Sequence, residues 1–173
     1  MPQLTLTGNP AADQLLSDNA FALLVGMLLD QQIAMELAFA GPMRLAERLD
    51  GPLEPATIAR TDLDALEAMF RTKPALHRYP GSMATRVHAL AGHLVDEYGG
   101  HAAAVWEGAT DGADLTGRLR ALPGFGDQTG CRKIERGLWS AVVGCGPAVG
   151  AGASRRVSRR ARRRGVSVSC PQA

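Results

Sequence analysis

The chain has 173 residues, of which 46% are hydrophobic, and a formal net charge of +2 at pH 7. This length supports one domain with a packed core, or two very small ones. The sequence has no apolar run of about eighteen residues, and MPQLTLTGNP at its start lacks the basic and apolar regions of a signal peptide. We therefore expect no membrane span and a cytoplasmic protein.

The charges are divided unevenly along the chain. Residues 1–128 carry nine Lys and Arg against sixteen Asp and Glu, a balance of −7, whereas residues 129–173 carry ten Lys and Arg and one Glu, a balance of +9. Twenty leucines precede residue 129 and one, Leu138, follows it. Such a division predicts a globular domain over 1–128 and a basic segment over 129–173.

The stretch SDNAFALLVGMLLD, which starts at Ser17, carries the first strong helical pattern. Phe21, Leu24 and Leu28 recur at spacings of three and four, and the positions between them are also apolar. This pattern predicts a helix buried on most of its faces. We expect Ser17 or Asp18 to be its N-cap.

Further helices are expected downstream. The sequence predicts one helix from Ala34 toward Leu49, with a break or kink at Gly41-Pro42, and a short one after Thr61 or Asp62. A third starts at Pro80 or Ser82 and runs to Tyr98, where Gly99 and Gly100 end it. A fourth is predicted over 112–122. Trp106 and Trp139 are expected in the core. Because alternation with a period of two is essentially absent up to residue 128, the fold class is all-α.

The turn Leu122-Pro123-Gly124-Phe125-Gly126 joins the last of these helices to another expected from Asp127. Its glycines permit positive φ and a close approach of the backbone to a partner. Amides of this loop and of the next helix start would form a concavity that suits a phosphate, with Phe125 in the core. The alternative is an ordinary helix–helix connection with a C-terminal glycine.

Three segments together resemble the endonuclease III-like helix-hairpin-helix (HhH-GPD) superfamily of DNA glycosylases. They are FALLVGMLLDQQIAMELA at 21–38, YPGSMATRVHALAGHLVDEYGG at 79–100, and LPGFG at 122–126. The similarity covers about residues 15–128. More specifically, the chain resembles small actinobacterial-type members of the superfamily, which lack an iron–sulfur cluster. It implies an orthogonal helical domain with a helix-hairpin-helix motif, and a function in base excision repair, in which a damaged base is flipped out of double-stranded DNA and its N-glycosidic bond is hydrolysed.

The resemblance also implies site residues. Gln32 matches a glutamine that is inserted into DNA, and its alternative role is to cap nearby carbonyls. The hairpin amides would hold a phosphate, with a possible monovalent cation. Arg86 would contact DNA or lie on a solvated helix face, and Asp30 would be a pocket acid or cap the following helix. The expected DNA-binding residues are Gln31, Gln32, Arg86, Pro123, Gly124, Phe125, Gly126 and Gln128.

The catalytic residues of the superfamily are not found. Its aspartate lies some twenty residues beyond the hairpin, but no aspartate follows Asp127 and the only later acid is Glu135. Bifunctional members carry a lysine where this chain has Gln128, and Lys133 would point elsewhere. We therefore identify no catalytic residue and expect a glycosylase-like chain that is inactive as it stands.

No metal or iron–sulfur site is expected. The cysteines, Cys131, Cys145 and Cys170, form no CxxC motif. The four histidines also lack the spacing of a metal site, since His88 and His93 are five positions apart and do not share a helix face.

The basic segment 129–173 has two interpretations. It is a disordered arginine-rich arm that binds nucleic-acid phosphates, or it is the product of a frameshift, because Arg, Gly, Ala, Pro, Ser, Val and Cys are what a GC-rich gene encodes out of frame. The alternative function is accordingly a non-catalytic nucleic-acid-binding module that uses the hairpin and the arm. In either case we expect a monomer that binds double-stranded DNA in the cytoplasm, at the nucleoid.

Overall fold

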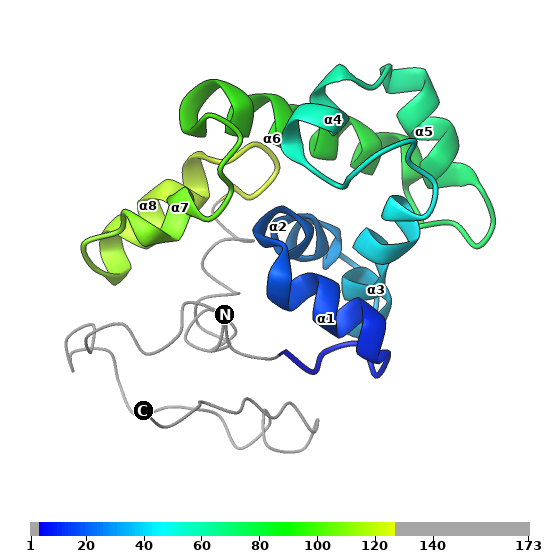
Figure 1. The fold of residues 1–173 in the computed structure, drawn as a ribbon, viewed down its shortest axis with the longest axis horizontal. Helices are drawn as coiled ribbons and strands as arrows, with labels where there is room; N and C mark the ends of the chain where they lie inside the picture. The colour runs from blue at the N-terminus through cyan, green and yellow to red at the C-terminus, as the bar shows by residue number, and fades with distance from the viewer. Residues whose placement is uncertain (1–3, 127–173) are drawn as a thin grey trace.

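The computed structural model describes residues 4–126, which form eight helices and no strand (Figure 1). This confirms the all-α fold class. The helices are α1 (Pro10–Asp18), α2 (Ala20–Leu29), α3 (Met35–Ala46), α4 (Pro55–Arg60), α5 (Leu63–Arg71), α6 (Pro80–Tyr98), α7 (Ala104–Glu107) and α8 (Gly112–Ala121). The expected helix from Asp127, and with it Gln128, Trp139 and the basic segment, lie outside the described residues.

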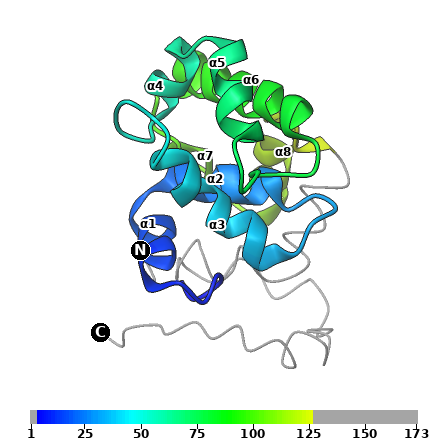
Figure 2. The same ribbon diagram turned by 90° about the vertical axis from the view of Figure 1, so that its right-hand side faces the viewer.

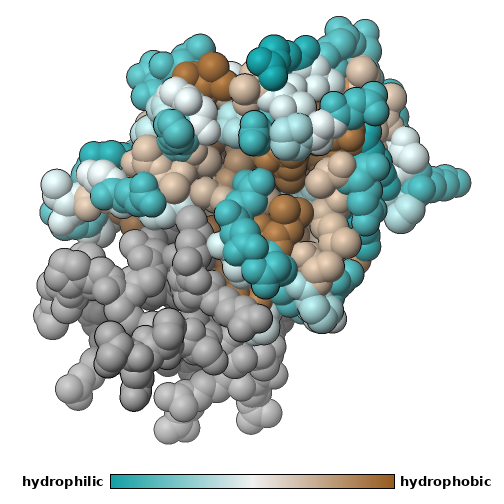
Figure 3. All heavy atoms as spheres, in the orientation of Figure 1, coloured by the Kyte–Doolittle hydropathy of each residue, from teal (hydrophilic) through white to brown (hydrophobic). Residues whose placement is uncertain are grey.

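The helices pack in three groups, and the first two of these meet where α2 contacts α6. Helices α1, α2 and α3 pack together, α4 and α5 pack on α6, and α7 packs on α8 (Figure 2). Every residue of α2 from Phe21 to Leu29 is buried, as a helix that is apolar all round must be. On the face that the space-filling view shows, hydrophilic residues cover much of the described surface, and hydrophobic ones gather near its middle and at its upper edge (Figure 3).

The start of α2 differs from the prediction. Its N-cap is Asn19, whose side chain accepts from the Ala22 N–H, and not Ser17 or Asp18. Those two residues end α1, a helix that the sequence analysis missed. The Ser17 hydroxyl accepts from the Leu4 N–H at 3.0 Å and donates to the Asp13 carbonyl at 2.8 Å, so it anchors the N-terminal segment and caps no helix.

Of the break or kink predicted at Gly41-Pro42, the break is wrong, because α3 runs through both residues. Proline removes one backbone donor from a helix interior. Close packing on α2 compensates for this loss: a Cβ placed on Gly41 would lie 2.6 Å from Leu29 Cδ1, and Phe39 is fully buried against Gly26. The small residues bring α3 against α2, and burial keeps the helix continuous.

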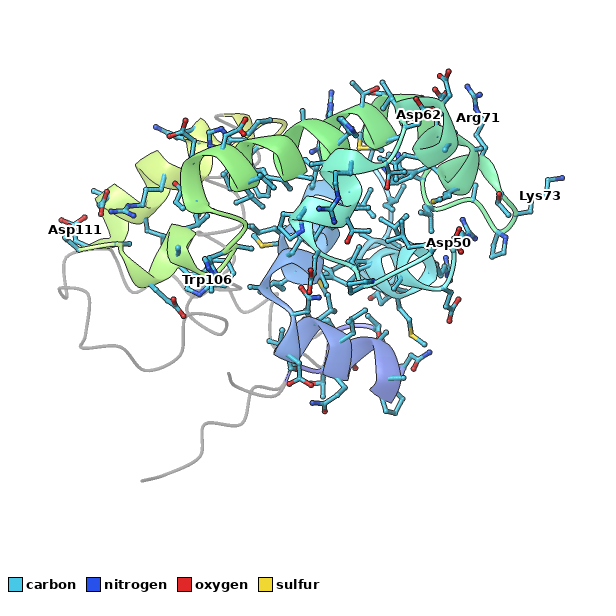
Figure 4. All side chains as sticks on the ribbon, turned by 45° about the horizontal axis from the view of Figure 1, so that its top comes forward. Asp50, Asp62, Arg71, Lys73, Trp106 and Asp111 are labelled. Atoms are coloured by element: carbon cyan, nitrogen blue, oxygen red, sulfur yellow. The ribbon has the colours of Figure 1, made fainter. Side chains whose placement is uncertain are left out.

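The remaining predicted helices are confirmed. Asp62, and not Thr61, caps α5, Pro80 opens α6, and Gly99 ends α6 in the left-handed conformation at φ 57°. Figure 4 shows the α5 cap, Asp62, and the α8 cap, Asp111, at opposite ends of the molecule. The short helices α4 and α7 were not predicted, but Trp106 of α7 lies in the core as expected, 6% exposed.

Within residues 4–126, no single helix is long and apolar enough to cross a membrane. Helices α1 and α2 pass that test only as a pair, with a bend of 115° between them. Both contribute to the protein core.

Candidate nucleic-acid interface

Three segments that are distant in sequence meet beside the end of α2. They are the turn over residues 30–34, here named the Gln turn, the first half of α6, and the loop over residues 122–126, here named the hairpin loop. Figure 2 shows the Gln turn and the hairpin loop on the same side of the molecule. Each predicted site residue that the structure describes belongs to one of these segments.

Gln31 connects all three segments through its side-chain amide. Its Nε2 donates to the Leu28 carbonyl at 2.9 Å and to the Gly124 carbonyl, in the hairpin loop, at 3.3 Å. Its Oε1 accepts from Nη1 of Arg86, in α6, at 2.8 Å. Both amide protons are thus used inside the protein, as is the acceptor oxygen. This geometry gives Gln31 a structural role.

His77 holds the backbone of the same residue. The Tyr79 N–H donates to His77 Nδ1 at 3.1 Å, so the other ring nitrogen, Nε2, carries the proton in the neutral ring. That Nε2–H donates to the Gln31 carbonyl at 2.8 Å. His77 is 3% exposed, and its ring ties the entry of α6 to the Gln turn in a partly buried contact.

Gln32 follows Gln31 in the sequence but is exposed to solvent, whereas the Gln31 side chain is bonded inside the protein. The φ of Gln32 is 62°, the only positive value for a non-glycine residue in the described part of the chain. A left-handed backbone costs a residue with a side chain on the order of 1–2 kcal/mol. The contacts at Gln31 compensate for that cost, and the turn presents Gln32 to the solvent.

The hairpin loop packs closely against α2 and α6. Gly124 has a φ of 82°, and a Cβ placed on it would lie 2.8 Å from Leu28 Cδ1 and 3.4 Å from Arg86 Cβ. Phe125 is 1% exposed, as predicted, and its N–H donates to the Leu122 carbonyl at 3.2 Å. Glycine is therefore required at position 124 by both conformation and space.

Other predicted residues have different outcomes. Asp30 is the C-cap of α2, and the N-cap of α3 is Ala34, which has no capping side chain. In the hairpin loop, Pro123 is partly buried and Gly126 is exposed, and Gln128 lies outside the described residues. The role of His77 was not predicted, and its only signal in the sequence is its place three residues before the proline that opens α6.

Two further observations concern metal-binding groups and a surface depression. Among residues 4–126, no group of three or more His, Cys, Asp or Glu is placed to hold a metal ion. A shallow depression lies elsewhere, between α1 and α3, and its lining includes Leu37 and Arg44 but no residue of the Gln turn or the hairpin loop.

Comparisons with known proteins add little to this geometry. No family model matches the chain, and no curated protein matches it. Among solved structures, it is similar to endonuclease III in a trapped covalent intermediate with DNA, an estranged-adenine complex, with a TM-score of 0.48 and 23% identity. The similarity covers 69% of this chain and 52% of that one, so this chain spans about half the length of that protein. The function therefore has to be argued from the site.

Proposed function

We propose that this chain is a DNA-repair protein of the helix-hairpin-helix glycosylase type, which binds double-stranded DNA at a damaged base pair. One observation carries the proposal: the exposed Gln32 follows a residue whose amide is bonded to the hairpin loop. The same segments, Gln turn and hairpin, are those in which the sequence resembles the superfamily.

The arrangement suits a bent, partly opened duplex. The hairpin loop supplies exposed backbone at Gly124 and Gly126 for a DNA phosphate, and the Gln turn supplies a polar side chain for the gap that a flipped base leaves. Flipping costs a few kcal/mol, least at a damaged or mismatched pair. Insertion of Gln32 would offset part of this cost and so favour lesions over intact DNA.

Cleavage of the N-glycosidic bond needs more than binding. Glycoside hydrolysis uses carboxylates to stabilise an oxocarbenium-like sugar and to activate the nucleophile. Because the sequence has neither the expected aspartate after residue 127 nor a lysine at position 128, we propose that this chain recognises a lesion without releasing the base.

The charge distribution favours a second candidate. Ten of the nineteen basic residues lie in residues 129–173. A basic arm of this kind would bind nucleic acid through phosphates, with affinity that falls steeply with salt and no preference for a lesion. In that function the hairpin loop is one contact and the arm is another.

A base-release assay combined with binding separates the candidates. The full chain, its Gln32→Ala variant and a chain lacking residues 150–173 are tested on duplexes with uracil, alkylated or oxidised bases and with a tetrahydrofuran abasic analogue. The first candidate predicts no base release. It also predicts that the full chain binds the duplex with the abasic analogue more tightly than the intact duplex, and that Gln32→Ala removes this difference. If the full chain binds damaged and intact duplexes equally, and deletion of residues 150–173 abolishes this binding, the result supports the second candidate. Base release would show that the chain is an active enzyme.

A further inference from the structure

Arg86, in the first half of α6, lies between the Gln turn and the hairpin loop. Its Nη1 donates to Gln31 Oε1 at 2.8 Å, while its Cβ and Cδ lie 3.4 and 3.5 Å from the position a Cβ would take on Gly124. One side chain thus contacts both turns, by a hydrogen bond on one side and by its aliphatic stem on the other.

The bond from Arg86 also fixes how Gln31 is oriented. With its oxygen held by Arg86, the Gln31 amide must direct Nε2 to the other side, where it donates to the carbonyls of Leu28 and Gly124. An amide turned the other way would face the guanidinium with its NH₂ group, donor against donor, and would leave both carbonyls without that donor. Arg86 therefore selects the orientation that joins the Gln turn to the hairpin loop.

We propose that Arg86 is a positioning residue that acts through Gln31 to hold the hairpin loop and Gln32 at one fixed spacing. This inference rests on the proposed function. A phosphate held by the hairpin and a base step reached by Gln32 are parts of the same duplex, so insertion succeeds only at the spacing the DNA requires. Small errors of placement have large effects in such pre-organised sites.

A role as a direct phosphate contact is the competing assignment for this arginine, and it has a different signature. Loss of a phosphate contact weakens binding to damaged and intact DNA alike and lowers the salt slope by about one. Loss of a positioning contact lowers the preference for damaged DNA and leaves the salt slope in place.

The test uses the full chain and five variants. Arg86→Met keeps most of the aliphatic stem and removes the donor, Arg86→Lys keeps the charge and a donor, and Gln31→Ala removes the acceptor. The double variant Arg86→Met/Gln31→Ala closes the cycle. Arg78→Met is the matched control, because it makes the same chemical change at an exposed arginine in the segment just before α6.

Two readouts are taken on DNA. The first is the ratio of affinities for a duplex with the abasic analogue and for the intact duplex, over a range of salt concentrations. The second is the emission of 2-aminopurine placed as the target base, which rises when the base leaves the stack.

We expect Arg86→Met and Gln31→Ala each to lower the affinity ratio and the emission change roughly tenfold, and the double variant to lower them no further, because residues of one network are not additive. Arg86→Lys restores part of both, and Arg78→Met leaves both near wild type. An unchanged ratio with a salt slope lowered by about one, or additive effects in the double variant, overturns the inference.

The same cycle is measured on thermal unfolding without DNA. Non-additive changes in Tm show that the Arg86–Gln31 bond exists whatever the DNA result. If the wild type binds no duplex, the proposed function fails and the positioning role fails with it. If the wild type prefers the lesion but the variants do too, the proposed function stands and the role of Arg86 alone is wrong.

Discussion

Two surface regions of the protein are held in different ways. Around the depression between α1 and α3, the hydrogen bonds of Thr7 and Asn9 join residues two to six positions apart. At the candidate interface, the bonds of Gln31 to His77, Arg86 and Gly124 join residues 46, 55 and 93 positions apart. The depression is a gap between neighbouring helices, whereas three distant segments build the interface. Concavity alone is therefore a poor guide to function here.

The largest expected difference between the two regions concerns buried hydrophobic residues. Phe125→Ala should lower the free energy of unfolding by about 3–5 kcal/mol, because the Phe125 ring anchors the hairpin loop in the core and its loss leaves a cavity. Leu37→Ala, in the lining of the depression, should change it by less than about 0.5 kcal/mol, because Leu37 is 51% exposed. Denaturant unfolding of both variants measures this, and equal effects would contradict the contrast.

The next effect is expected from the glycines. Gly124→Ala should cost about 1–3 kcal/mol, since it combines a left-handed backbone with a clash against Leu28. Gly8→Ala is the matched control: Gly8 has a φ of 73°, but a Cβ there meets nothing within 4 Å, so only the backbone cost remains. Thermal unfolding compares the two, and a control as damaging as Gly124→Ala would show that the close contact with α2 does not matter.

A smaller effect is expected at Gln32, and its sign is the informative part. Gln32→Gly relieves the left-handed backbone but gains freedom in the unfolded chain, which leaves a net stabilisation of about 0.5 kcal/mol. The same variant should lose the preference for a duplex with an abasic analogue. Gln32→Ala keeps the backbone cost and should lose the preference without the gain in stability. A Gln32→Gly protein that is less stable than the wild type would show that the turn stores no strain.

The smallest effect lies at the start of α8, where the contacts are again local. The Thr110 N–H, and then Arg118, lower the pKa of Asp114 below its ordinary value of 3.8. Because the folded protein binds this proton more weakly than the unfolded chain does, the contribution to stability is present above pH 3.8 and fades as the pH falls through the lower, folded pKa.

Unfolding of the wild type and of Asp114→Asn as a function of pH measures that contribution. The difference between the two proteins should be small at neutral pH, because the group is at the surface, and should shrink toward zero in acid. Asp96→Asn removes an exposed carboxylate from α6 and is the charge control. A difference that grows as the pH falls would reverse the sign of the argument.

The sequence was sufficient for the long helices but not for the contacts between them. Residues 20–29 and 80–98 have strong periodicity, so both helices were predicted, although the expected N-cap of the first lay slightly too early. Helix α1 was missed because Ser17 and Asp18 have the composition of a cap, and only the contact of Ser17 with Leu4 shows otherwise. The helix does not break at Gly41-Pro42 because α3 packs against Leu29 there, a contact that no local sequence pattern shows.

Some features of the candidate site could likewise be predicted from the sequence, and others could not. The resemblance of short segments predicted Gln32 and the hairpin loop as parts of one site, and the burial of Phe125 is confirmed. It also placed Gln31 among the DNA-binding residues, whereas the structure uses the Gln31 amide internally. The contributions of His77 and Arg86 could not be predicted, because they depend on contacts across 46 and 55 residues.

The measurement that tests the central claim most directly is the binding of the full chain and of Gln32→Ala to two duplexes of one sequence, with and without a single abasic analogue, at matched salt. The account predicts that the wild type binds the damaged duplex roughly tenfold or more tightly than the intact one, and that Gln32→Ala binds both about equally. Equal affinity of the wild type for the two duplexes would contradict it.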